Sequence, residues 1–169
     1  MTTSRRGVFG LFALAASGVA AAAAEGNKHL KFSDLKKFAG TSVLYHVDFG
    51  EPARFGQVLN NITNHYAAYN NDPKKIKIVI VTHSQGVKYF LKDLSGSPWE
   101  KETVDPAIYN RFVELTKLGL EAYLCEVTFK RLNLDPEKAK VESFISWVPS
   151  GVATVGDLQA KGYSYLKVG

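Results

Sequence analysis

The stretch IVIVTHSQGV, residues 78–87, combines the end of a strand with the start of a helix. Its first five residues, Ile78 to Thr82, are all β-branched, which favours a buried strand. Residues 83–86 then read HSQG, and a short helix is expected over 87–94. Strand, Ser and Gly, then helix is the outline of the nucleophile elbow G-x-S-x-G. The stretch therefore points to an α/β fold and offers Ser84 as a candidate nucleophile.

The rest of the sequence weakens the hydrolase interpretation. In α/β-hydrolases the catalytic His follows the Ser along the chain. The histidines here are His29, His46, His65 and His83, and all of them precede Ser84. Thr82 also stands where the elbow needs a small residue. Ser84 is better read as a helix N-cap. His83 remains of interest because it ends a strand at the carboxyl edge of a sheet, where ligands bind in open α/β folds.

Strands and helices alternate along the remainder of the chain. Strands are expected over residues 41–49, 76–82, 120–125, 144–148 and 163–168, and helices over 52–69, 87–94, 106–118, 126–132 and 152–161. The strands are nearly all apolar, as parallel strands covered on both faces are. The sequence therefore predicts an α/β fold: a five-stranded, mainly parallel sheet with helices on both faces, a three-layer sandwich.

The N-terminus has the pattern of an export signal. Arg5 and Arg6 precede an apolar run, and Ala22-Ala23-Ala24 suits a cleavage site. We expect a signal peptide over residues 1–24, of twin-arginine type or for general secretion, a linker over 25–40 and one domain over 41–169. The mature protein would be periplasmic, with no stable insertion in the membrane.

Charge and cysteine content narrow the function classes. The formal net charge of +5 falls to +3 when Arg5 and Arg6 leave with the signal, and no basic stripe remains, so nucleic acid is not an expected partner. The single cysteine, Cys125, excludes an internal disulfide. Cys125 closes a strand where the chain turns into a helix, and the helix dipole there favours a thiolate. The alternative is a buried, inert residue at the end of an apolar strand. Both interpretations stay open.

Other residues are expected at the same edge. The turn Pro149-Ser150-Gly151 leads into a helix and would aim N–H groups at an anion, although a plain N-cap by Ser150 is favoured. Asp48 ends the first strand and would either orient His83 or shape the turn. A metal site from His46, Asp48, His65 and His83 has no H-x-H or H-x-x-x-H spacing in its favour, so none is predicted.

Several motifs together resemble the DsrE/DsrF-like family of sulfur-relay proteins, in its exported, small single-domain branch. They are YHVDFG, LNNITNH, KIVIVTHSQGVKYFL, SPWEKE, CEVTFKRLNL and VPSGVATVGDLQAKGYSYLKVG, all within residues 41–169. The resemblance implies that Cys125 receives sulfane sulfur as a persulfide and passes it on without a cofactor. His83, Ser84, Asp48 and the Pro149–Gly151 turn would form a crevice beside it.

The resemblance also implies partners. Relatives form homo- or hetero-oligomers, often trimers or hexamers, so a homo-oligomer and a protein that donates or accepts sulfur are expected. The alternative is a non-catalytic, oligomeric protein of the periplasm that binds a small ligand or a partner, with Cys125 in its core.

Overall fold

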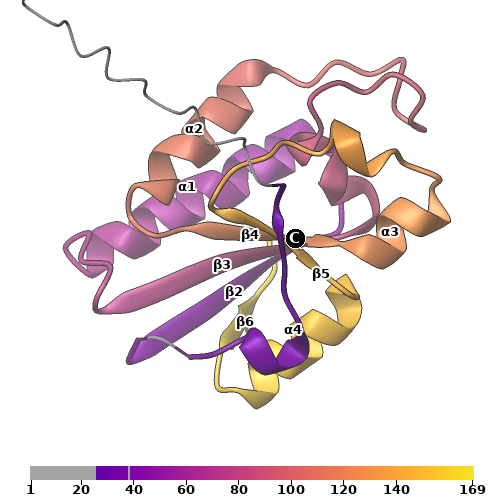
Figure 1. The fold of residues 1–169 in the computed structure, drawn as a ribbon. Coiled ribbons are helices and arrows are strands. Elements are labelled where there is room, and N and C mark those ends of the chain that lie inside the picture. Colours follow the sequence, from indigo (N-terminus) through magenta and orange to yellow (C-terminus); the bar gives the residue numbers. More distant parts are fainter. Residues whose placement is uncertain (1–25, 38) are drawn as a thin grey trace, which may run out of the picture.

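A computed structural model describes residues 26–37 and 39–169 of the chain. The predicted signal peptide lies outside these residues. The sheet has six strands in the order β1-β5-β4-β3-β2-β6, and every neighbouring pair is parallel (Figure 1). The strands are β1 (Lys28–His29), β2 (Thr41–Val47), β3 (Ile76–Thr82), β4 (Glu121–Cys125), β5 (Ile145–Val148) and β6 (Ser164–Leu166). The predicted fold class is confirmed, with one strand more than expected.

The α-helices follow the strands in the expected order. They are α1 (Pro52–Ala68), α2 (Pro106–Thr116), α3 (Glu126–Arg131) and α4 (Gly151–Ala160). Three 3₁₀-helices complete the described elements: η1 (Phe32–Asp34), η2 (Ser84–Phe90) and η3 (Pro136–Lys138). Within the described residues, no helix has the length and apolar character that a membrane span requires.

The extra strand comes from the segment expected to be a linker. Lys28 and His29 pair with Ser146 and Trp147 of β5 and so form one edge of the sheet. The prediction of five strands was wrong here because two exposed residues carry no alternating pattern. The chain then crosses the sheet face beside α4, where Tyr163 donates a hydrogen bond to the carbonyl of Lys36 at 2.8 Å (Figure 1).

The helix expected over residues 87–94 is instead the 3₁₀-helix η2, which begins at Ser84. Its N-cap residue is His83, so the prediction of Ser84 as the N-cap was wrong. Ser84 has a φ of 49°, a left-handed conformation that non-glycine residues rarely adopt. Gly86 packs against β2 so closely that an added Cβ would lie 2.3 Å from the carbonyl oxygen of Val47. This close packing sets the tight turn that follows β3.

Two apolar layers enclose the sheet. α1 and α2 cover one face, whose core includes Phe55, Ile62 and Phe112. α4 covers the other face, where Leu158 packs with residues of β2 to β5 (Figure 1). The carboxyl ends of the strands therefore lie at one edge, below the start of α4.

Candidate functional site

Three of the predicted site residues lie in one row across the carboxyl edge. The last β2–β3 pair is Val47 with Thr82, and Thr82 also pairs with Leu124 of β4. One residue further along, Asp48, His83 and Cys125 therefore stand on adjacent strands, about 5 Å apart. Because side chains alternate along a strand, all three project on the face that α4 covers.

Cys125 is the last residue of β4 and the N-cap of α3. Its Sγ accepts a hydrogen bond from the backbone N–H of Thr128 at 3.3 Å. Only 4% of the residue is exposed to solvent. The thiol is thus buried, but its surroundings include a polar donor, the backbone N–H of Thr128.

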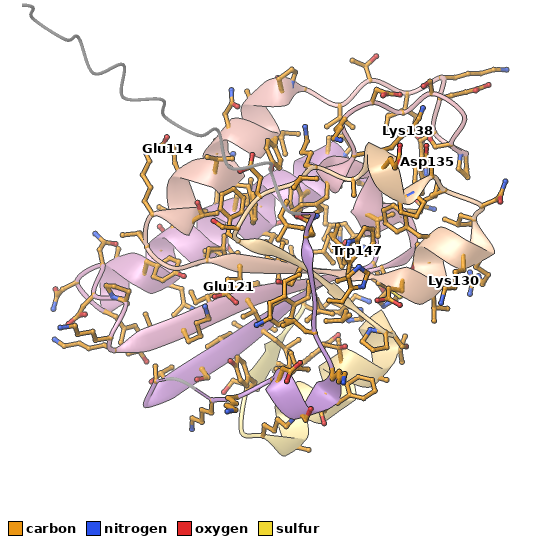
Figure 2. All side chains as sticks on the ribbon, viewed as in Figure 1. Glu114, Glu121, Lys130, Asp135, Lys138 and Trp147 are labelled. Atoms are coloured by element: carbon orange, nitrogen blue, oxygen red, sulfur yellow. The ribbon has the colours of Figure 1, made fainter. Side chains whose placement is uncertain are left out.

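Two charged residues of α3, Glu126 and Lys130, make their contacts away from this sulfur. Lys130 extends from α3 into solvent (Figure 2), and 80% of its side chain is exposed. Glu126 Oε1 lies 2.8 Å from Nδ1 of His29 in β1, and Glu126 Oε2 lies 4.0 Å from Lys130 Nζ. Glu126 is therefore paired toward the β1 edge of the sheet.

His83 forms a close pair with His46 of β2. Their Nε2 atoms lie 2.7 Å apart, so one N–H donates to the lone pair of the other ring. Burial, opposed by the nearby charge of Asp48, lowers the pKa of His46 to about 4. Burial likewise lowers the pKa of His83, and Lys167 and Arg131 act in the same direction. Both imidazoles are neutral near pH 7.

Asp48 lies beside this pair and already has a cationic partner. Its Oδ2 accepts a hydrogen bond from Lys167 Nζ at 2.8 Å. Burial raises the pKa of the Asp48 carboxyl, but Lys167 and His46 outweigh it, so the pKa lies below its usual value. The carboxylate is ionised and accepts hydrogen bonds only.

The Pro149–Gly151 turn places the N-terminus of α4 above the row. Ser150 is the N-cap, with its Oγ accepting the N–H of Ala153 at 3.4 Å. A Cβ added at Gly151 would lie 2.8 Å from His83 Cβ and 3.2 Å from Cys125 Cβ. Only glycine lets the helix approach these two side chains so closely.

Ser84 supports His83 and the α3 turn. Its Oγ lies 3.1 Å from His83 Nδ1, and its backbone N–H donates to Thr128 Oγ1 at 3.0 Å. The other nitrogen of His83 faces His46 rather than a carboxylate, so the orientation of a Ser–His–Asp triad does not occur here.

The chain is similar to a known protein family and to a solved structure. The profile of the DsrE/DsrF-like family matches residues 42–168, nearly all of the described chain. The chain belongs to the DsrE/DsrF-like family. A solved structure of a protein of unknown function from Methanobacterium thermoautotrophicum, MTH1491, is similar, with a TM-score of 0.58 and 22% sequence identity. The match covers 75% of this chain and 98% of that one, and it supports the fold alone. No curated protein matches the sequence.

In this DsrE/DsrF-like chain, sequence reasoning missed how His46 belongs to the site. His46 stands two residues before Asp48, and side chains two residues apart project on the same face of a strand. This spacing is the sequence signal that would have placed His46 beside Asp48. His65, which the sequence grouped with them, lies on α1 and meets Tyr45 at 3.2 Å. It takes no part in the row.

Proposed function

We propose that this DsrE-family protein carries sulfane sulfur as a persulfide on Cys125. Family membership supports a sulfur-relay type of protein. The observation that carries the proposal is the place of the chain's one thiol: the carboxyl edge of β4, with its Sγ accepting the Thr128 N–H and with His83 as its neighbour across the strands. Thiolate chemistry needs such donors close to the sulfur.

The reaction requires only thiols. The Cys125 thiolate attacks the outer sulfur of a donor persulfide, R–S–SH, so that a new S–S bond forms. The donor S–S bond breaks, and its electron pair leaves on the donor thiolate, R–S⁻. An acceptor thiolate then attacks the outer sulfur held on Cys125 and restores the Cys125 thiolate. No net oxidation takes place, and no cofactor is needed.

Access to the sulfur is the demanding step, because only 4% of Cys125 is exposed. α3 has six residues, and this cysteine is its N-cap. A helix this short has little stability of its own, so its opening gives a route to the thiol. The same low exposure favours the second candidate function, a non-catalytic binding protein in which Cys125 is part of the core.

Intact-mass spectrometry of the purified protein separates the two candidates. Treatment with polysulfide should add about 32 Da, one sulfur atom, and a reductant should remove it. An alkylating probe should react with Cys125 near neutral pH and block this gain. Cys125→Ser is the control and should gain no mass. If Cys125 reacts only after denaturation, the binding candidate replaces the carrier.

We also propose that the protein is exported to the periplasm and assembles there as a homo-oligomer, a trimer or hexamer, that meets a sulfur donor or acceptor protein. The exposed Tyr165 and Leu166 of the edge strand β6 offer apolar surface for a second copy. Fractionation of cells that express the full chain tests export. Sedimentation of the purified protein tests assembly, and a monomer at micromolar concentration would refute it.

A further inference from the structure

A cluster of potential metal ligands lies at the carboxyl edge, apart from the thiol chemistry. His46, Asp48 and His83 each offer one ligand atom, and these atoms all lie within 4.8 Å of one another. All three are half-buried; His46 lies in β2, and Asp48 and His83 directly follow the paired strands β2 and β3. The rigid sheet therefore fixes the spacing of the three side chains.

We propose that His46, His83 and Asp48 bind a divalent first-row transition ion, Zn²⁺ in particular, through the two Nε2 atoms and one carboxylate oxygen. Two imidazoles and one carboxylate are a ligand set that Zn²⁺ accepts, with the fourth tetrahedral position left to water. This proposal does not depend on the sulfur-carrier function.

The outer hydrogen bonds of both imidazoles already suit metal binding. His46 Nδ1 lies 2.9 Å from the Tyr165 hydroxyl, and His83 Nδ1 lies 3.1 Å from Ser84 Oγ. A histidine that binds metal through Nε2 carries its proton on Nδ1 and donates it to such a partner. The two hydroxyls thus hold both Nε2 atoms toward one point.

A change of tautomer lets both imidazoles bind one ion. The Nε2 atoms of His46 and His83 face each other at 2.7 Å. One proton lies between the two Nε2 atoms. When the ring that carries this proton changes to the tautomer with the proton on Nδ1, the second Nε2 lone pair becomes free and no proton is lost.

Two small movements open the site to the ion. Zn–N bonds of about 2.0–2.1 Å in a tetrahedron place two nitrogens about 3.3 Å apart, so the Nε2 atoms separate by roughly 0.6 Å from 2.7 Å. Lys167 must also release Asp48. Because 37% of the Lys167 side chain is exposed, its ammonium can move into water at little cost. Lys167 is thus a competitor for the same carboxylate.

Titration of the chelator-treated protein with Zn²⁺, followed by calorimetry, tests the site. We expect one ion per chain and a higher Tm with Zn²⁺. His46→Gln and His83→Gln should each weaken binding by more than about 100-fold, and Asp48→Asn should weaken it by about tenfold or more. His65→Gln, on the other side of the sheet, is the matched control and should leave the affinity unchanged. Binding of Zn²⁺ by His46→Gln or His83→Gln with the affinity of the unaltered protein would refute the proposal.

Lys167→Met gives a test that misfolding cannot imitate, because the variant should bind Zn²⁺ several-fold more tightly. Co²⁺ adds a spectroscopic readout: a visible band of tetrahedral Co²⁺ should appear, and Cys125→Ser should leave it unchanged. A sulfur-to-metal band that disappears in Cys125→Ser would overturn the ligand set. Weaker or unchanged Zn²⁺ binding by Lys167→Met would also contradict it, since the lysine would then not compete with the ion.

Discussion

Replacement of Gly151 by alanine tests the close contact between α4 and the candidate site. The new Cβ would lie 2.8 Å from His83 Cβ and 3.2 Å from Cys125 Cβ, where ordinary carbon contacts are about 3.5–4.0 Å. Neither neighbour can rotate away, because a Cβ atom is fixed by its own backbone in β3 or β4. The start of α4 must therefore move outward. Such overpacking typically costs about 1–3 kcal/mol of the free energy of unfolding.

Gly156→Ala, in the same helix, is the matched control. A Cβ at Gly156 would meet nothing within 4 Å, so this change should stabilise the helix by about 0.5–1 kcal/mol. Urea denaturation of both variants should separate their free energies of unfolding by about 1.5–4 kcal/mol, with Gly151→Ala the less stable. If Gly151→Ala were as stable as Gly156→Ala, α4 would not press on His83 and Cys125 as described.

Three further predictions concern stability. The pKa of His46 is about 4 when folded and near 6.5 when unfolded, so the unfolded chain takes up the proton first as the pH falls. Stability should decline from pH 6.5 to 4 by at most about 3 kcal/mol, and His46→Gln should flatten this part of the stability–pH curve. Thr128→Ala leaves the Ser84 N–H without its acceptor and should cost about 1–3 kcal/mol in urea, whereas Thr128→Ser should cost less. Lys88 is 4% exposed and pairs with half-exposed Glu102, so Glu102→Ala should destabilise the protein more than Lys88→Met does, as measured by chemical denaturation.

The sequence predicts the central strands well because their β-branched and apolar runs are long. β2 to β5 fall within about two residues of the predicted ranges. β1 was missed because Lys28 and His29 are both exposed, and a strand of two residues has no side-chain pattern. The helix over 87–94 was placed too late, because the chain turns directly at Ser84 in a left-handed conformation. Ser84 has no feature in the sequence that distinguishes it from an ordinary N-cap.

The site could be predicted only as a list of residues at strand ends. That Asp48, His83 and Cys125 share a face depends on the register between strands, since a shift by one residue moves a side chain to the opposite face. The four central strands carry only a few polar residues, among them Ser42, Lys77 and Ser146, so the alternation that marks this face is weak. His46 and His65 illustrate the consequence. His46 follows Tyr45 in the sequence and His65 contacts the Tyr45 hydroxyl, but only His46 contacts a residue of the row, His83.

The register also makes the two proposed roles separable by experiment. His83 stands between its neighbours in the row, with Cys125 on β4 on one side and Asp48 on β2 on the other. His46 belongs to the metal cluster alone and Cys125 to the sulfur chemistry alone, whereas His83 is a member of the cluster and also the register neighbour of Cys125. Loss of metal binding without loss of persulfide in a His46 variant, together with the reverse in a Cys125 variant, would establish two functions on one edge. A His83 variant would affect both, because His83 adjoins Cys125 in the strand register and also contributes a ligand nitrogen.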